Sequence, residues 1–344
     1  MRSSRLVRSR KLPAPASFGR GAVLVHDDCL PRRVRGFAAW ARRFPACYPV
    51  RAGETLKSVE AFPRHVRHLV DLAGGFDRRE ATLVCAGGGS VGDFGGFAAS
   101  VLQRGIRLVH VPSTWLAAID SAHGGKTGLN VAGTKNPLGT FYPAAAVHLV
   151  KELLFAQPRA RADDGLAELV KMALLAGGPW ARRFCRSPLA GPELAWEFLE
   201  PAIRAKLQVV RTDPEERSGQ RQVLNLGHTL GHVLEAYHGL THGKAVAQGL
   251  FFALEWSRKK AGLPAADAEA FAALVARHTR SRPLATRLPP ISRATFLPLL
   301  VRDKKSGSGS HVTFVFLRGL GHPLRRRVSH AEVAREAALQ GWVG

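Results

Sequence analysis

The chain has 344 residues, of which 46% are hydrophobic, enough apolar side chain for two packed domains or one large α/β unit. No run of about eighteen apolar residues occurs, so the sequence indicates no membrane-spanning helix. Its four cysteines are far apart, which argues against a disulfide framework and favours a reducing, cytoplasmic setting. The net charge of +24 favours anionic partners, and because no aromatic residues alternate with the basic ones, phosphorylated small molecules are favoured over specific nucleic-acid binding.

The start of the chain alternates between strand and helix patterns. Residues 1–20 are basic, and we expect a disordered arm there, since no cleavage site follows that would mark a transit peptide. An apolar run at 23–25 predicts a strand, and residues 32–43 predict a helix. Residues 53–57 form a turn that leads into a second helix, which ends near Gly74.

A glycine-rich turn is the first candidate site. The buried strand expected at 81–86 leads into Gly87-Gly-Gly-Ser-Val-Gly-Asp93, where a helix is expected to begin. A strand at 106–111 completes a β-α-β unit, which predicts a parallel sheet. Backbone N–H groups in such a turn can bind a pyrophosphate, although the spacing is not G-x-G-x-x-G and a plain tight turn is the alternative. The sequence therefore predicts a Rossmann-like α/β nucleotide-binding domain over residues 21–153.

Polar and glycine residues follow this unit in a short span. They are Ser113, Thr114, Asp120, Gly124-Gly-Lys126-Thr-Gly and Lys135-Asn136. Two lysines and an asparagine among glycines suit a polar cleft that accepts an anion. A solvated glycine-rich loop is the alternative.

The pattern becomes helical after residue 153. Helices are expected at 165–176, 201–212, 246–260 and 265–278, and a late strand at 311–317. We therefore predict a second, mostly α-helical domain over residues 154–344.

The second candidate site lies in this helical half. If residues 229–237 are helical, His228, His232 and Glu235 share one face, and His242 follows a short turn. Two histidines four residues apart can bind Zn²⁺ together, or one can hold the metal while the other donates to an anion. Solvated helix histidines are the alternative. The glycines beside the pair favour a site, because small neighbours let a ligand come close.

In their order and spacing, these motifs resemble the 3-dehydroquinate synthase family. The resemblance extends over roughly residues 27–328 and also includes Arg104-Gly105, Gly165-Leu-Ala-Glu168-Leu-Val-Lys171, Leu224-Asn-Leu-Gly-His228 and Asp303-Lys-Lys305. It implies a homodimer whose α/β domain binds NAD and whose helical domain binds a divalent metal, Zn²⁺ or Co²⁺. The implied substrate is 3-deoxy-D-arabino-heptulosonate 7-phosphate, which the family converts to 3-dehydroquinate and phosphate in the shikimate pathway.

The family's chemistry is a phosphate-eliminating cyclisation. NAD⁺ takes a hydride from the C5 carbinol, phosphate leaves by β-elimination, and the hydride returns before ring opening and intramolecular aldol closure. The metal stabilises charge that grows on the C5 oxygen. The resemblance therefore implies a carbon–oxygen lyase that ends each cycle with NAD⁺ regenerated.

The resemblance also assigns roles to residues of this chain. The metal ligands it implies are Glu168, His228 and His242, although without it Glu168 is interpreted as a helix-face carboxylate paired with Lys171. NAD contacts carry over to Glu54, Lys57, Gly87, Gly88, Gly89, Gly92, Asp93, Ser113, Thr114, Asp120 and Lys135. The phosphate and carboxylate of the substrate are assigned to Arg104 across the dimer interface, Lys126, Asn136, Lys171, Lys206, Arg221, Asn225, His232 and one of Lys304 and Lys305.

Three departures from the family pattern leave alternatives open, and one of them is that Val150-Lys151 replaces the acidic residue usual near Leu149. Lys244 stands where the family has a glutamate beside the ligand histidine, and His123 replaces a small or branched apolar residue. The alternatives are cyclases that make 2-deoxy-scyllo-inosose or valiolone-type products, metal-dependent polyol or glycerol-phosphate dehydrogenases, and a non-catalytic basic binding protein. The substrate residues kept from the family pattern favour dehydroquinate synthases over the other cyclases. The presence of all three implied metal ligands argues against a non-catalytic protein.

Overall fold

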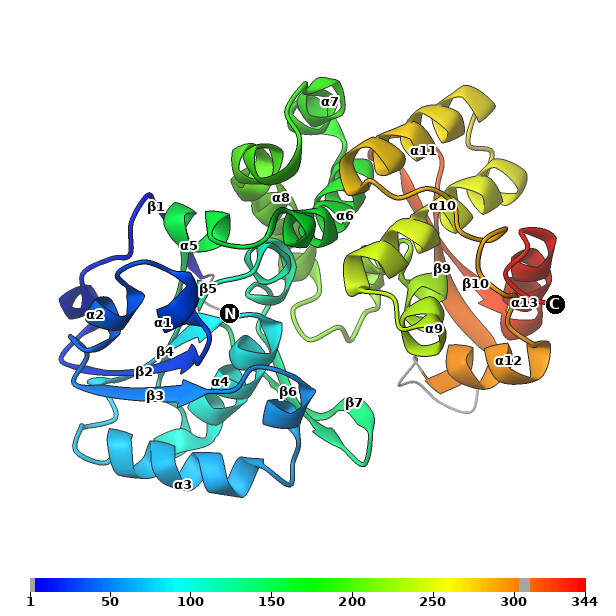
Figure 1. Cartoon of the computed structure of the whole chain (residues 1–344). Helices are drawn as coiled ribbons and strands as arrows, with labels where there is room; N and C mark the ends of the chain where they lie inside the picture. Colours follow the sequence, from blue (N-terminus) through cyan, green and yellow to red (C-terminus); the bar gives the residue numbers. More distant parts are fainter. Residues whose placement is uncertain (1–3, 303–309) are drawn as a thin grey trace. The chain divides into compact units, whose positions relative to one another are not determined.

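The computed structural model describes residues 4–302 and 310–344, and the chain divides into two compact units, Met1–Ala162 and Asp163–Gly344. Figure 1 colours the chain from its N-terminus to its C-terminus. Among the described residues, no helix is both long and apolar enough to span a membrane.

The first unit is built on a six-stranded sheet in the order β1-β8-β5-β4-β2-β3, and every neighbouring pair is parallel. The strands are β1 (Arg5–Ser9), β2 (Gly21–Asp27), β3 (Ala46–Val50), β4 (Ala81–Gly87), β5 (Arg107–Pro112) and β8 (Ala146–Val150). The central strands β2 and β4 are buried along almost their whole length, as expected where helices cover both faces. The predicted parallel α/β sheet is confirmed.

The prediction of a disordered N-terminal arm is wrong for β1. Arg5–Ser9 pairs with β8 in parallel register, from Arg5 opposite Ala146 to Ser9 opposite Val150. Leu6 and Val7 are half-buried while Arg5 and Arg8 are exposed. The strand thus covers backbone groups of β8 that would otherwise form an open sheet edge, and its basic side chains face water.

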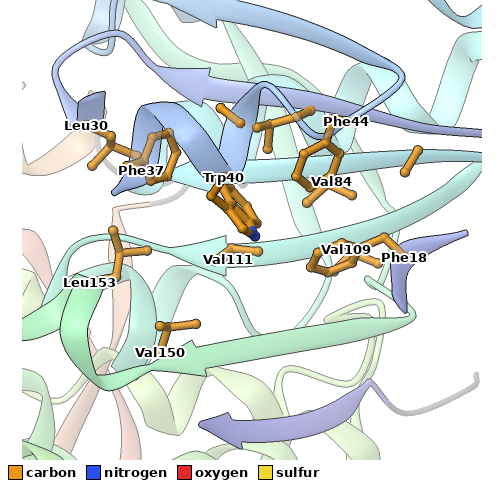
Figure 2. Packing of buried hydrophobic residues seen from close by; sticks show 14 of the residues in the cluster. Phe18, Leu30, Phe37, Trp40, Phe44, Val84, Val109, Val111, Val150 and Leu153 are labelled. Carbon is orange, nitrogen blue, oxygen red and sulfur yellow. The ribbon is translucent and has the colours of Figure 1, made fainter. Parts of the chain in front are cut away.

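One face of the sheet carries an aromatic cluster. Phe37 and Trp40 of α2 (Phe37–Ala41) belong to this cluster, and Trp40 lies over Val111 of β5 (Figure 2). Val84 and Val109, which are opposite each other on β4 and β5, are also part of it. The indole Nε1 of Trp40 donates to the carbonyl of Pro13 at 2.6 Å. The helix predicted at 32–43 is in fact two short helices, α1 (Leu30–Arg33) and α2, because Gly36 between them is left-handed with φ 82°.

The other face carries α3 (Phe62–Ala73) and α4 (Gly89–Val101), as Figure 1 shows. α4 lies close to β4, since a Cβ on Gly95 would stand 2.2 Å from the sulfur of Cys85. α4 begins at Gly89, four residues before the predicted start. The unit also contains an unpredicted antiparallel hairpin, β6 (Lys126–Val131) with β7 (Thr134–Phe141), and the short helix α5 (Lys151–Phe155).

Over its described residues, 163–302 and 310–344, the second unit is mostly helical, as predicted, and contains one β-hairpin. Its helices are α6 (Arg159–Ala176, whose first turn belongs to the first unit), α7 (Gly178–Arg186), α8 (Gly191–Thr212), α9 (His228–His238), α10 (His242–Lys260), α11 (Ala265–Thr279), α12 (Arg293–Arg302) and α13 (His330–Leu339). The predicted strand at 311–317 is β9 (His311–Leu317), which pairs antiparallel with β10 (Pro323–Ser329). Trp256 of α10 packs edge-on against Phe314 of β9, with ring centroids 4.5 Å apart. This contact anchors α10, whose first residue belongs to the candidate site.

Candidate active site

Three helices of the second unit each bring one candidate metal ligand. Glu168 lies within α6, His228 is the first residue of α9, and His242 is the first residue of α10. α6 and α10 approach closely because residue 243 is glycine: a Cβ there would stand 2.2 Å from the Cα of Asp164. Thr241, just before α10, donates its hydroxyl to Asp164 at 2.5 Å. These contacts fix the start of α10 against α6.

The three candidate ligands converge on one point. Their ligand atoms all lie within 4.8 Å of one another. Oε1 of Glu168 is 3.3 Å from Nε2 of His228 and 3.3 Å from Nε2 of His242. Glu168 is fully buried, and the two histidine side chains are 12% and 27% exposed. The set is therefore shielded at the carboxylate and open at the imidazoles.

The hydrogen bond at Nδ1 of each histidine ring fixes the tautomer of that ring. Nδ1 of His228 is 3.1 Å from the carbonyl of Leu226, and Nδ1 of His242 is 3.1 Å from Oε2 of Glu235. Carbonyls and carboxylates only accept hydrogen bonds, so each Nδ1 carries a hydrogen and donates. In the neutral ring each Nε2 then presents a lone pair toward Glu168. Three converging acceptors need a positive charge between them. A proton on Nε2 of His242 supplies it in the metal-free protein, and a divalent metal such as zinc can replace that proton, because His₂Glu is a known zinc ligand set.

Electrostatics in the cluster depend on Lys171. Its ammonium pairs with Oε2 of Glu168 three residues earlier, as the sequence indicated, and both side chains are buried. Burial alone raises the pKa of Glu168, but Lys171 and His228 hold that pKa well below its ordinary value. Burial and Lys171 lower the pKa of His228 to about 4. Burial also opposes protonation of His242, but hydrogen bonds to Glu168 and Glu235 raise its pKa to about 10.

The face of α9 that first indicated a metal site does not supply all of the candidate ligands. Of the three residues on that face of α9, only His228 belongs to the converging group. The ring of His232 lies 5.0 Å from that of His228 and 6.3 Å from that of His242, centroid to centroid. Glu235 instead contacts His242. The two other ligands come from other helices, which helical spacing alone could not reveal.

Other predicted substrate residues of this unit are buried cations. Lys206 of α8 and Arg221 of the 3₁₀ helix Gln220–Asn225 are each about 5% exposed or less, and α8 packs against that 3₁₀ helix. Arg221 donates through Nη1 to the carbonyl of Pro214 at 3.0 Å. Asn225 ends the 3₁₀ helix and is half-buried. Lys304 and Lys305 lie outside the described residues.

In the first unit, the glycine turn meets the loop after β5. Gly88 immediately precedes α4, and a Cβ there would stand 3.2 Å from Cγ2 of Thr114. The backbone N–H of Ser113 donates to the carbonyl of Gly87 at 2.8 Å. A small pocket beside the turn is lined by Gly87, Gly88, Gly92, His110, Ser121 and neighbouring residues. The first backbone N–H groups of α4 have no acceptor within their own helix, and helix N-termini of this kind can bind a pyrophosphate.

Charged residues meet at the other side of this turn. Nζ of Lys57 is 2.6 Å from Oδ2 of Asp93, and Lys57 is buried. Burial raises the pKa of Asp93 despite the lowering effect of the Lys57 ammonium. Oε2 of Glu54 accepts a hydrogen bond from Asn130 at 2.6 Å, and Oδ1 of Asn130 accepts one from the backbone of Asn136 at 3.0 Å. Asn130 was missed in the sequence because nothing marked the β6–β7 hairpin.

The remaining predicted residues of this unit lie on irregular backbone. Asp120 belongs to the π-helix Ala117–Ser121, whose Ala117 N–H donates to Oγ1 of Thr114 at 3.2 Å. Lys126 and Lys135 are exposed on the β6–β7 hairpin, and Arg104 is exposed with φ 61°.

Two of the departures from the family pattern, His123 and Lys244, have different surroundings. His123 is buried, and its Nε2 donates to the carbonyl of Ala118 at 2.8 Å, which secures the π-helix. Lys244 is exposed in the first turn of α10. Residues two apart on a helix point about 200° away from each other, so Lys244 faces away from the direction of His242. The charge change at 244 therefore lies outside the converging ligand set.

Comparisons with known proteins agree with this description. Sequence profiles of the 3-dehydroquinate synthase N-terminal and C-terminal domains match residues 47–163 and 165–306. A 3-dehydroquinate synthase from Aeropyrum pernix is 38% identical over 334 residues, covering 94% of this chain and 89% of that protein. One from Bordetella pertussis is 41% identical over 275 residues, covering 76% and 73%.

A solved structure extends the comparison to the fold. It is 2-deoxy-scyllo-inosose synthase complexed with carbaglucose-6-phosphate, NAD⁺ and Co²⁺, with a TM-score of 0.78, 23% identity and coverage of 96% of this chain and 95% of that one. At this identity the likeness concerns the fold alone, whereas the relatives above match in sequence along most of their length. This chain belongs to the 3-dehydroquinate synthase family.

Proposed function

We propose that the protein is a 3-dehydroquinate synthase, which converts 3-deoxy-D-arabino-heptulosonate 7-phosphate to 3-dehydroquinate and phosphate. The observation that carries the proposal is the convergence of Glu168, His228 and His242, with ligand atoms within 4.8 Å, in a chain 38% identical to a protein of that name. On the family resemblance we further propose that it acts as a homodimer in the cytoplasm.

The metal is proposed to be held by these three side chains. Held there, a divalent cation supplies Lewis acidity toward the oxygens of the substrate. Lys171 occupies the second oxygen of Glu168 through an ion pair, so Oε1 remains the oxygen directed at the histidines. The exposed edges of the two imidazoles leave room for substrate oxygens, as a catalytic rather than structural zinc site requires.

NAD is proposed to bind the glycine turn of the first unit. NAD⁺ held there supplies a reversible hydride acceptor, and the related cyclase structure contains NAD⁺ as well as Co²⁺. The N-terminal turn of α4 binds the pyrophosphate through backbone N–H groups. Lys57 and Asp93 hold one side of the turn, and the Ser113 N–H to Gly87 bond holds the other.

The substrate carries a phosphate and a carboxylate, and the proposed donors are basic or amide side chains. Lys206, Arg221 and Asn225 of the second unit are proposed to provide them. Burial of Lys206 and Arg221 strengthens their attraction for an anion, because little water screens them. Cyclases acting on sugar phosphates without a carboxylate remain the second candidate, because one has the same fold.

Metal removal tests the proposal. Dialysis against a chelator is expected to abolish phosphate release from 3-deoxy-D-arabino-heptulosonate 7-phosphate, and added Zn²⁺ or Co²⁺ is expected to restore it. His228→Ala should lose at least about a hundredfold in rate and resist restoration, because one of three ligands is missing. A matched control is His311→Ala, which removes an exposed histidine from β9. Full activity of the chelated protein, or of His228→Ala, would contradict the metal assignment.

A further inference from the structure

We propose that Glu235 is a positioning residue for His242: its carboxylate holds the ring so that Nε2 is directed at the metal. The inference rests on the proposed function, since it concerns the same metal set. Glu235 touches neither substrate nor metal in this account and acts through His242. Its own helix face had suggested it as a ligand, but it contacts the ring of another ligand instead.

The ring of His242 is held between two carboxylates. Nδ1 lies 3.1 Å from Oε2 of Glu235, and Nε2 lies 3.3 Å from Oε1 of Glu168. A carboxylate acceptor at Nδ1 requires the hydrogen to be there, which leaves Nε2 as the ligand atom. An acidic partner also makes an imidazole a stronger donor to a metal.

The two ligand histidines depend on different kinds of support. His228 donates to the backbone carbonyl of Leu226, which no side-chain substitution removes. His242 is more exposed, 27% against 12%, and donates to a side chain. A substitution at 235 therefore removes the support of one ligand while the other keeps its own.

Charge balance gives a second reason for a carboxylate at this position. Within the cluster, Lys171 neutralises Glu168 through their buried ion pair. With neutral histidines, that pair presents almost no net charge to a divalent cation. Glu235, 23% exposed, adds one negative charge next to the ligand set and at most partly screened by water. Its loss is therefore expected to weaken cation binding as well as ring orientation.

The experiment measures metal binding in the purified full-length protein. The zinc dissociation constants of wild type, Glu235→Ala and Glu235→Gln are determined by competition with a chromophoric chelator. The absorption spectrum of the Co²⁺-loaded proteins reports the ligand geometry. Glu255→Gln is the matched control: it alters a half-exposed glutamate thirteen residues beyond His242 on α10, about 20 Å along the axis.

We expect Glu235→Ala to weaken zinc binding about 10- to 100-fold, Glu235→Gln to weaken it less, and both to change the Co²⁺ spectrum. Glu255→Gln should match wild type, and the unfolding midpoints of the metal-free proteins should agree. A zinc dissociation constant within about twofold of wild type in both Glu235 variants would overturn the inference. Should Glu235→Ala fail to fold, Glu235→Gln alone decides. Failure of wild type to bind zinc would overturn the metal assignment itself, a separate result.

Discussion

Among single residues, Lys244 is a position where this chain carries a cation and the family pattern has a glutamate. It is exposed and points away from the side of α10 that carries His242. Lys244→Glu restores the family's residue, and we expect it to change both the zinc dissociation constant and the turnover rate by less than about twofold. Zinc competition and steady-state kinetics check this. A tenfold gain in either quantity would mean that Lys244 acts on the metal site.

Lys171 is expected to matter for folding as well as for the site. Lys171→Met removes the ammonium that pairs with the fully buried Glu168, and breaking a buried ion pair typically costs about 3–5 kcal/mol. Denaturant unfolding of the metal-free protein measures the loss. Arg204→Met, which breaks an exposed pair with Glu200, should cost less than about 1 kcal/mol. Equal costs for the two variants would contradict the account of the buried pair.

The sequence predicted individual ligands only in part. His228 stands out because His232 follows four residues later beside glycines, His242 follows them in a further His-Gly pair, and Lys171 was expected to pair with Glu168. That pairing is why Glu168 looks like an ordinary surface carboxylate: one of its oxygens does form the i,i+3 ion pair, while the other faces the histidines. Only three-dimensional convergence, or a family resemblance, separates the two interpretations.

At the scale of elements, β1 gives the clearest difference between prediction and structure. Deleting residues 1–10 removes the parallel pairing with β8 and is expected to lower the free energy of unfolding by about 1–3 kcal/mol, the sum of several backbone hydrogen bonds. Denaturant unfolding tests this. Replacing Arg5 and Arg8 by serine keeps the strand and should have little effect. If residues 1–10 were a disordered arm, their deletion would leave the free energy of unfolding unchanged.

The first turn of α13 provides a pH-dependent prediction. Glu332 completes a capping box with Ser329 and pairs with Lys260. The hydrogen bond from Lys260 and those from Ser329 lower the pKa of Glu332 to about 2. The stabilisation is therefore complete above the unfolded pKa of about 4.3 and is lost as pH falls toward 2. Urea unfolding should show the gap between wild type and Glu332→Gln narrowing from about pH 6 to 3. A constant gap would contradict this pairing.

Helix boundaries were harder to predict than helices. α9 and α10 were expected at 229–237 and 246–260, but α10 begins at His242, directly after Thr241. Thr241 precedes α10 but does not cap it through its side chain. Its hydroxyl instead donates to Asp164 on α6, a tertiary contact that local sequence does not reveal. Similarly, the β6–β7 hairpin is largely exposed on β7, so no buried alternation marked it. A tertiary contact therefore accounts for the first difference from the prediction, and the exposure of β7 accounts for the second.

At the scale of the whole molecule, the sequence predicted the parallel sheet of the first unit and the helical second unit. Strands 81–86 and 106–111 were recognisable because both faces of a central parallel strand are apolar. The added edge strand β1 was not, because its exposed arginines make it resemble a solvated arm.

The products of the complete reaction distinguish the proposed synthase from the alternative enzymes. The purified protein is incubated with 3-deoxy-D-arabino-heptulosonate 7-phosphate, NAD⁺ and Zn²⁺, and phosphate, 3-dehydroquinate and NADH are followed together. The account predicts one dehydroquinate for each phosphate released, without net NADH, and no turnover of glucose 6-phosphate, which lacks the carboxylate. Accumulating NADH would indicate a dehydrogenase, and cyclisation of glucose 6-phosphate with no reaction of the heptulosonate would contradict the proposed substrate.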